Sequence, residues 1–469
     1  MRLTKIVASI SDLRCDVDFI RSLYEAGMNV ARINTAHITP ETALQVISNV
    51  RKVSNKIAIL IDTKGPEVRT SKLATPITVT KGDILKVSGK FEASGEGRLL
   101  VSYDKFQDDV EPGNRILIDD GDIGLEVIEK NEFLVCRVEN DGVIKNNKSV
   151  NVPGITIELP SVTDKDRMFI EFAIENQLDF IAHSFVRNRQ DVLDVQQILD
   201  QHNSPIKIIA KIENLDGINN IDEILEQAYG IMVARGDLGI EIPAEKLPGL
   251  QRRLIKKSIE FKKPVIVATQ MLHTMIEHPR PTRAEVNDIA NAVYSRTDAL
   301  MLSGETAYGK YPVEAVKTMA RIAEETELSY DNRNDVAFPI LENEIQVYLA
   351  EAAIKASNEL PVKAIIATTT TGKTSRYLSA FRGTVPVYAV CHSMRVVREM
   401  ALSFGVFPSY LEIKKNKFKI EKAAISLLAQ KKVFGKDDLI IYVGGRFGQD
   451  AGASFIEIST VDKFKIEPA

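Results

Sequence analysis

The sequence predicts an α/β protein built on a (β/α)8 TIM barrel, and three observations lead to this fold class. Eight short apolar runs recur before residue 303, and segments with helical periodicity separate many of them. The runs are apolar almost throughout, which is typical of parallel strands that are buried on both faces. Eight such units favour a closed barrel over an open sheet.

The eight predicted strands are interrupted once, after the third. They comprise residues 5–10, 29–34, 57–62, 179–184, 206–211, 230–235, 264–269 and 298–302. The clearest predicted helices comprise residues 17–25, 40–53, 192–201 and 250–262. A last helix is expected to open at Pro312 and continue through 313–325, because proline suits the first helical position.

The interruption has the sequence pattern of a small β domain. Its alternating segments predict strands at residues 76–79, 84–87, 116–119 and 125–127. Asn140-Asp141-Gly142 favours a hairpin turn. We expect residues 71–152 to form a β-barrel lid at the mouth of a catalytic barrel made of residues 1–70 and 153–328.

A third unit is predicted after a polar linker at 329–335. Helices are expected at 342–357, 373–381, 394–404 and 419–430, and strands at 363–368, 385–390 and 438–443. This alternation predicts an open α/β sheet, so residues 336–469 are expected to be a C-terminal α/β domain.

Composition excludes several classes of partner and compartment. The chain has 60 Lys and Arg against 64 Asp and Glu, so no overall field attracts nucleic acid or a membrane surface. No apolar stretch is long enough to cross a bilayer. Only three cysteines occur, Cys15, Cys136 and Cys391, without metal-binding spacing, which favours a reducing compartment. We expect a cytoplasmic protein.

Polar residues cluster where the predicted barrel strands end, which is where barrel enzymes hold their active sites. They are Arg32, Asn34, His37, Asp62, Thr63, Lys64, Glu67, Arg69, Ser184, Arg187, Lys211, Glu213, Arg235, Gly236, Asp237, Thr269, Gln270, Ser303, Glu305 and Thr306. Any one of these is more often a solvated side chain than a catalytic group. Together they predict one polar mouth.

Two carboxylates on neighbouring strands, Glu213 and Asp237, are candidate ligands of Mg²⁺, which takes one or two protein carboxylates together with substrate oxygens. Strand alternation aims Lys211 at the same face as Glu213. A cation beside an oxygen-bound metal is what a phosphoryl group needs during transfer. The residues therefore predict phosphoryl transfer, and the absence of HExxH and GxSxG motifs lowers the weight of hydrolase alternatives.

The loop at 369–374 is a candidate phosphate site in the third unit. Thr371-Gly372-Lys373-Thr374 matches the end of a P-loop, but Ala367 stands where that loop needs glycine, so an ATPase site is excluded. Thr369, Thr371, Gly372 and Thr374 remain candidates for holding a phosphate at a helix start. An ordinary N-capped helix is the alternative.

Long blocks of the chain resemble the pyruvate kinase family. The matching blocks are 27–32 (GMNVAR), 62–67 (DTKGPE), 211–214 (KIEN), 232–239 (MVARGDLG), 268–271 (ATQM), 279–285 (PRPTRAE) and 301–307 (MLSGETA). The resemblance implies transfer of a phosphoryl group from phosphoenolpyruvate to ADP, giving pyruvate and ATP in the last step of glycolysis. It also implies a barrel, a lid and a C-terminal regulatory domain.

The resemblance also implies residue roles. Glu213 and Asp237 would bind Mg²⁺ or Mn²⁺, Lys211 would bridge the phosphoryl group, and Arg32 would hold phosphate and nucleotide. The backbone at Gly236 and Asp237 would meet the substrate carboxylate, and Thr269 would help to deliver a proton. The remaining candidates are Ser184 for substrate and Asn34, His37, Arg69 and Lys148 for the nucleotide.

A potassium site and an effector site are further implications of the resemblance. Asn34, Asp62 and Thr63 match K⁺ ligands, Ala36 replaces a serine ligand, and Glu67 matches an acidic residue that accompanies K⁺ dependence. The loop of Thr369, Thr371, Gly372, Lys373 and Thr374 resembles the site of a sugar-phosphate or nucleotide effector. A homotetramer is expected from the family.

Two other functions stay open from the residues alone. One is a magnesium-dependent barrel lyase acting on pyruvate or phosphoenolpyruvate. The other is a catalytically silent metabolite sensor, against which the intact Lys211, Glu213, Asp237 and Thr269 argue.

Overall fold

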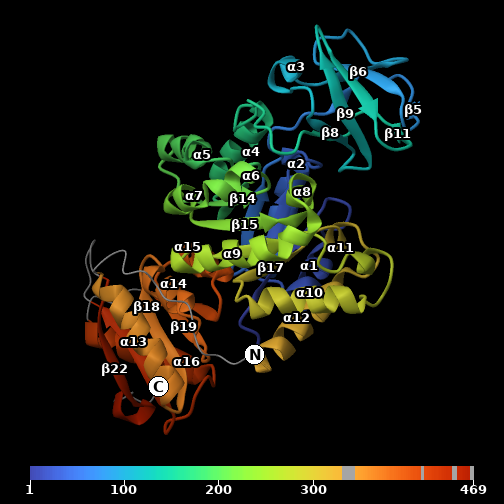
Figure 1. The fold of residues 1–469 in the computed structure, drawn as a ribbon. Coiled ribbons are helices and arrows are strands. Elements are labelled where there is room, and N and C mark those ends of the chain that lie inside the picture. The colour runs from blue at the N-terminus through green and yellow to red at the C-terminus, as the bar shows by residue number, and fades with distance from the viewer. Residues whose placement is uncertain (330–343, 413–416, 446–451, 465–469) are drawn as a thin grey trace.

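The computed structural model describes residues 1–329, 344–412, 417–445 and 452–464, which form three units (Figure 1). The barrel lies in the middle, with the lid at one end and the C-terminal unit at the other. No helix among the described residues is both long and apolar enough to span a membrane. Each unit has its own apolar clusters of buried side chains.

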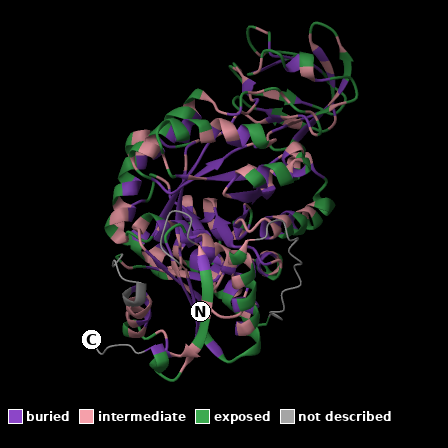
Figure 2. Cartoon of the chain, turned by 90° about the vertical axis from the view of Figure 1, so that its left-hand side faces the viewer, coloured by how far each residue is buried: buried purple, intermediate pink, exposed green. Residues whose placement is uncertain are grey.

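Eight parallel strands close into the predicted barrel, in the order β1-β17-β16-β15-β14-β13-β3-β2. They are β1 (Lys5–Ser9), β2 (Val30–Asn34), β3 (Ala58–Asp62), β13 (Phe180–His183), β14 (Lys207–Ile212), β15 (Gly230–Ala234), β16 (Val265–Ala268) and β17 (Ala299–Leu302). Alternate side chains, such as Leu60 and Met232, fill the barrel interior, while Ile59 and Val233 pack against the helices. Figure 2 shows these buried strands at the centre of the molecule.

The helices around the barrel follow local capping signals. In α2 (Pro40–Val53), Thr39 and Thr42 form a capping box and proline occupies the first turn. The other helices of this layer are α1 (Val17–Ala26), α4 (Asp164–Glu175), α5 (Arg189–Gln201), α6 (Leu215–Asn219), α7 (Ile221–Gln227), α8 (Arg235–Glu241), α9 (Leu247–Glu260), α10 (Arg283–Tyr294), α11 (Gly304–Ala307) and α12 (Pro312–Leu328).

The lid is a curled β unit. Its larger sheet has the order β12-β8-β9-β10-β6-β7-β4, and β11 pairs separately with β5. The elements are β4 (Thr70–Ser71), β5 (Ile77–Val79), β6 (Ile84–Ser88), β7 (Arg98–Val101), α3 (Phe106–Asp109), β8 (Arg115–Ile118), β9 (Ile123–Lys130), β10 (Leu134–Val138), β11 (Gly142–Ile144) and β12 (Val150–Asn151). An Arg69–Ser149 bridge joins the two sheet edges, and the Thr70, Asn147 and Val150 amides donate backbone hydrogen bonds across the same seam, so the expected β-barrel closes there.

The hairpin expected at Asn140-Asp141-Gly142 is wrong. The turn joins β10 to β11, but β11 pairs with β5 and not with β10. Its side chains fix this change of sheet, because Asn140 Oδ1 accepts the Gly124 amide at 2.9 Å and Asp141 Oδ1 accepts the Lys81 amide at 2.7 Å.

The C-terminal unit is an open sheet of order β20-β19-β18-β21-β22. Its elements are α13 (Ile345–Glu359), β18 (Val362–Thr369), α14 (Lys373–Ala380), β19 (Val387–Cys391), α15 (Met394–Glu399), a 3-10 turn (Met400–Leu402), β20 (Val406–Tyr410), α16 (Lys417–Gln430), β21 (Leu439–Gly445) and β22 (Ala453–Thr460). The sequence prediction lacked β20 and β22. The helix predicted at 394–404 is shorter, and most of the linker expected at 329–335 lies outside the described residues.

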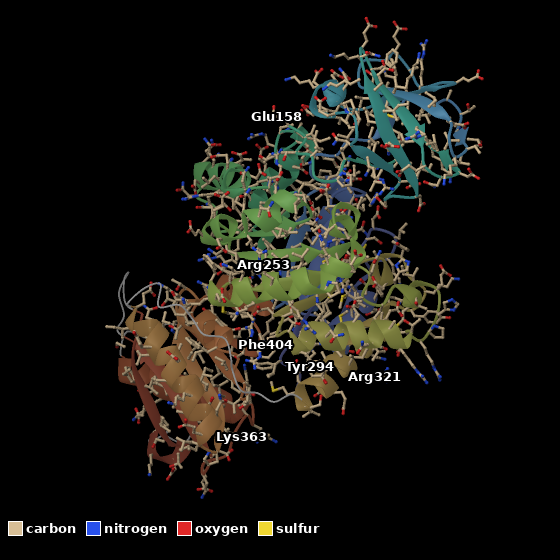
Figure 3. The ribbon with its side chains drawn as sticks, viewed as in Figure 1. Glu158, Arg253, Tyr294, Arg321, Lys363 and Phe404 are labelled. Atoms are coloured by element: carbon tan, nitrogen blue, oxygen red, sulfur yellow. The ribbon has the colours of Figure 1, made fainter. Side chains whose placement is uncertain are left out.

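The C-terminal unit closes the lower end of the barrel. Leu402 is fully buried and belongs to the same apolar cluster as the barrel-interior residues Val7 and Met301. Phe404 lies at this seam, between the barrel and the C-terminal sheet (Figure 3), and the Arg382 guanidinium stands 4.9 Å from the centre of its ring. The barrel core is thus completed by a segment from another unit.

Candidate active site

A polar cavity of about 340 Å³ opens at the mouth of the barrel, beneath the lid. Its lining residues are Arg32, Asn34, Ala36, His37, Asp62, Thr63, Lys64, Glu67, Arg69, Asn147, Phe185, Lys211, Glu213 and Asp237. Most of the predicted site residues therefore meet in one place. Ser184, Gly236 and Thr269 lie just beside it, whereas Lys148 points elsewhere.

Lys211 is the centre of the site. Its ammonium lies 3.0 Å from Asp62 Oδ1 and 2.9 Å from Glu213 Oε1, and it donates a hydrogen bond to Ser184 Oγ at 2.7 Å. Burial lowers the pKa of Lys211, but the attraction of Asp62 and Glu213 outweighs burial and the pKa ends above its ordinary value. Lys211 is therefore a fixed positive charge. The predicted alignment of Lys211 with Glu213 is confirmed.

Glu213 and Asp237 follow neighbouring strands, β14 and β15. Glu213 accepts a hydrogen bond from the Phe185 amide at 2.7 Å. Burial raises the pKa of Glu213 against the attraction of Lys211, and burial also raises the pKa of Asp237. Burial thus outweighs the attraction of Lys211 at both carboxyl groups, and a divalent cation bound between them would favour their charged forms.

The donor set of the mouth fits magnesium better than a caged metal. Among residues 1–329, 344–412, 417–445 and 452–464, no group of three or more His, Cys, Asp or Glu side chains is arranged to hold an ion. Glu213 and Asp237 supply carboxylate oxygens only. Mg²⁺ is commonly held in this way, with water and substrate oxygens completing its coordination.

Arg32 is held in the mouth by two contacts. Its Nε donates to Asp62 Oδ2 at 2.6 Å, and its Nη1 donates to Ser9 Oγ at 2.8 Å. Asp62 therefore touches two cations, Arg32 and Lys211. Burial alone would raise the pKa of Asp62, but these cations lower it below its ordinary value. Ser9 was missed by sequence reasoning, because a small polar residue at the end of an apolar strand carries little signal.

Thr269 has a strained backbone and a fixed hydroxyl. Its φ of 69° lies in the left-handed region, which a β-branched residue rarely adopts. The hydroxyl accepts the Gly236 amide at 2.8 Å and donates to the Ala268 carbonyl at 2.7 Å. Arg235 supports this turn by donating to the Thr269 carbonyl at 2.6 Å. Strain maintained in this way is typical of functional positions.

Three of the four candidate nucleotide-binding residues line the cavity, and the fourth does not. Asn34 and His37 line the cavity, as does Arg69, which contacts Glu67 at 2.7 Å and the Asn147 carbonyl at 2.7 Å. Lys148 instead bonds Asp119 inside the lid at 2.7 Å.

The adjacent lid residue, Asn147, lines the cavity in place of Lys148 and was missed by sequence reasoning. Its φ of 61° is one that asparagine tolerates better than most residues, so the only signal available was an asparagine in a turn.

Ser184 and Thr63 hold the third and fourth strand ends together. Ser184 Oγ donates to the Thr63 carbonyl at 2.7 Å, and the Ser184 amide donates to Thr63 Oγ1 at 3.0 Å. Lys211 is attached to this pair through Ser184. The predicted potassium ligands Asp62 and Thr63 thus take part in the network that positions Lys211.

The candidate effector loop connects β18 to α14. Gly372 has a φ of 80°, and its amide donates to Thr369 Oγ1 at 2.8 Å. Gly372 is the N-cap residue of α14, and Thr371 Oγ1 accepts the amide of Lys373, the first residue of that helix, at 3.4 Å, so an ordinary helix start stays an alternative to a phosphate site. Thr374 is buried, and Lys373 is paired with Glu344 at 2.9 Å.

A closed barrel with two carboxylates and a buried ammonium at its mouth, and with a β unit inserted above them, defines a class of barrel phosphotransferases. Comparison with known proteins identifies the family within this class. A model of the pyruvate kinase barrel domain matches residues 1–316, and a model of the pyruvate kinase alpha/beta domain matches residues 348–459.

Full-length relatives agree with these matches. A pyruvate kinase of Borreliella burgdorferi is 47% identical over 480 aligned positions, which cover 98% of each chain. A pyruvate kinase of Geobacillus stearothermophilus is 46% identical and is matched over 71% of its length by 87% of this chain. The structure of a pyruvate kinase from Cryptosporidium parvum superposes with a TM-score of 0.93 at 35% identity, covering 98% of this chain and 96% of that one. The chain belongs to the pyruvate kinase family and is a phosphotransferase.

Proposed function

We propose that the protein transfers the phosphoryl group of phosphoenolpyruvate to ADP, producing pyruvate and ATP. The observation that carries the proposal is the position of Lys211, whose ammonium lies within 3.0 Å of both Asp62 and Glu213. A charge held in this way needs little reorganisation when a phosphoryl group passes beside it.

The other mouth residues take complementary roles. Arg32, fixed by Asp62 and Ser9, binds phosphate oxygens through its remaining donors. Glu213 and Asp237 would hold Mg²⁺, which supplies charge that neutralises the substrate oxygens. The backbone at Gly236 and Asp237 would meet the substrate carboxylate, and Ser184 would also contact the substrate. Thr269 helps to deliver the proton that converts the enolate of pyruvate into pyruvate.

Nucleotide binding is assigned to the opposite wall of the cavity. Asn34, His37 and Arg69 line it, and Asn147 joins them from the lid. Lys148 can contribute only after leaving Asp119, since the two side chains are 2.7 Å apart. We retain Lys148 as a nucleotide candidate that depends on lid movement.

Potassium activation is part of the proposal, with Asn34, Asp62 and Thr63 as ligands. Glu67 retains its carboxylate near this position, although Arg69 and Lys64 both contact it. Ala36 offers no hydroxyl, and Lys165 donates to its carbonyl at 3.2 Å. Turnover measured in KCl and in tetramethylammonium chloride tests this part, and equal rates in the two salts would contradict it.

The remaining proposals concern regulation, assembly and location. A sugar phosphate or nucleotide effector is assigned to the loop formed by Thr369, Thr371, Gly372, Lys373 and Thr374. A homotetramer and a cytoplasmic location are proposed from the family and from the three free cysteines. The domain limits of 1–70 with 153–328, 71–152 and 336–469 also remain proposals.

The test is a steady-state assay of pyruvate formation from phosphoenolpyruvate, with ADP and Mg²⁺ varied in turn. We expect turnover that requires both. Carbon–carbon cleavage without any need for ADP would favour the barrel lyase. Ligand binding without turnover would favour the silent sensor, and either result would overturn the proposal.

A further inference from the structure

The return segment, residues 152–159, leads the chain from the lid back into the barrel. It contains no helix or strand, and polar contacts to the barrel hold it. Thr156 Oγ1 donates to Asp216 Oδ2 at 2.6 Å, the Gly154 amide donates to Glu241 Oε2 at 3.4 Å, and Arg187 donates to the Ile157 carbonyl at 3.2 Å. Figure 3 labels Glu158 in this segment, between the lid and the barrel helices.

Two of these partners follow the metal carboxylates closely in the chain. Asp216 comes three residues after Glu213, and Glu241 comes four residues after Asp237. The intervening turns are short. Asn214 Oδ1 accepts the Gly217 amide at 2.8 Å and caps α6, while α8 carries both Asp237 and Glu241. The return segment is therefore linked to the two carboxylates through two short stretches of chain.

Beneath the return segment lies a second cavity of about 130 Å³, beside the active site. Apolar side chains from both sides face it, including Val152, Ile155, Phe185 and Ile240. The return segment is thus not packed tightly over this part of its length. It has room to move once its polar contacts are released.

We propose that Asp216 and Glu241 are positioning residues that fasten the return segment to the two stretches of chain that carry Glu213 and Asp237. Their contacts set the lid at a fixed place over Glu213 and Asp237. Releasing the segment lets the lid swing, so substrate binding weakens while the chemical step, which depends on Lys211, is kept. This inference rests on the proposed function for its kinetic part only.

The primary test compares Thr156→Val, Asp216→Ala and Asp216→Asn in the full-length chain. Valine and alanine remove the hydrogen bond, whereas an asparagine carbonyl still accepts from Thr156. Thr78→Val in the lid is the matched control, because Thr78 is exposed and lies on β5, which pairs with β11 within the lid. Amide hydrogen exchange of residues 152–159 is measured without ligands, and KM and kcat are measured separately.

We expect Thr156→Val and Asp216→Ala to speed exchange in the return segment and to raise KM for phosphoenolpyruvate about fivefold, the effect of one ordinary hydrogen bond. We expect kcat to stay within about twofold, because the transition-state contacts are unchanged. The double variant Thr156→Val/Asp216→Ala should show the same exchange rate and KM as either single variant, since both substitutions remove the same hydrogen bond. Asp216→Asn and Thr78→Val should match the parent.

The inference fails if exchange in residues 152–159 is unchanged in Thr156→Val, or if kcat falls while KM does not. It also fails if Asp216→Asn behaves like Asp216→Ala, which would make the charge rather than the bond responsible. Should Asp216→Ala not fold, Thr156→Val alone decides. A parent protein without pyruvate formation would refute the proposed function, while the exchange measurement would still test the fastening.

Discussion

Arg382 donates two hydrogen bonds to Asp298, at 3.1 and 2.5 Å, and each side chain is only 3% exposed. Arg382 follows α14 of the C-terminal unit, and Asp298 precedes β17 of the barrel. Asp298 also accepts the Phe404 amide at 2.9 Å and the Val265 amide at 3.1 Å. One buried carboxylate therefore joins the floor of the barrel to the C-terminal unit.

We predict that Arg382→Met destabilises the protein by about 3–5 kcal/mol, because it leaves the Asp298 charge buried without its partner. The urea midpoint of unfolding, followed by circular dichroism, measures this. Arg253→Met is the control, since Arg253 lies exposed on α9 (Figure 3). Equal midpoints for the two variants would show that the ion pair contributes nothing to stability.

Lys211→Met should lower kcat by several orders of magnitude, since a fixed charge facing the transferring group contributes several kcal/mol to the transition state. Mg²⁺ binding should survive, because removing the ammonium leaves Glu213 and Asp237 in place. Isothermal titration with Mg²⁺ and single-turnover kinetics separate the two effects. Lys363→Met, an exposed change on β18, is the control. Near-normal turnover in Lys211→Met would rule out the role assigned to Lys211.

Substitutions of Thr269 should distinguish the contribution of its hydroxyl to kcat from that of its strained backbone. Thr269→Ser keeps the bond to the Gly236 amide and removes the β-branch that disfavours a φ of 69°. We expect it to keep kcat within about tenfold, whereas Thr269→Val should lose about 100-fold or more, as expected for a proton-transfer group. Similar kcat values for serine and valine would exclude the hydroxyl from the reaction.

Glu241→Gln should change how stability depends on pH. Burial raises the pKa of Glu241 from 4.5 to about 7, so the folded protein keeps a proton that the unfolded chain loses between these values. The contribution of Glu241 to stability therefore falls as pH rises from 4.5 to 7 and stays low above 7. Glutamine does not ionise.

The variant should thus match the parent near pH 4 and exceed its stability at pH 8 by on the order of 1 kcal/mol, a value reduced for partial exposure. Denaturant titrations at the two pH values measure the difference. Glu158→Gln, an exposed change in the return segment that Glu241 contacts, is the control. A constant difference between Glu241→Gln and the parent at both pH values would contradict the elevated pKa.

The barrel was predictable because its signal is local and repeated. Strand β14 was expected at 206–211 and lies at Lys207–Ile212, and the helix expected at 40–53 is Pro40–Val53. The C-terminal sheet was predicted less well. Strand β20 carries Pro408, and a proline within an apolar run argues against a strand unless that strand lies at an edge, as β20 does.

In the site, too, contacts between residues close in the sequence were predictable, and contacts between distant residues were not. Lys211 and Glu213 are two residues apart at the end of β14, so alternation alone predicted that they face the same way, and their 2.9 Å contact confirms it. Ser9 reaches Arg32, and Asn147 reaches Arg69, across large separations in the chain. Such contacts depend on the folded barrel and on the placement of the lid, which no short pattern encodes.

The burial of Leu402 within the barrel floor bears on how the chain can be divided. A fragment that ends near residue 329 would expose the apolar side chains at the base of the barrel, and Asp298 beside them would lose Arg382. Such a fragment would tend to self-associate through those side chains rather than behave as a free-standing catalytic module. We therefore expect the first two units to need the third for solubility, and an exchange of C-terminal units between relatives to need the Arg382 to Phe404 stretch that supplies these contacts.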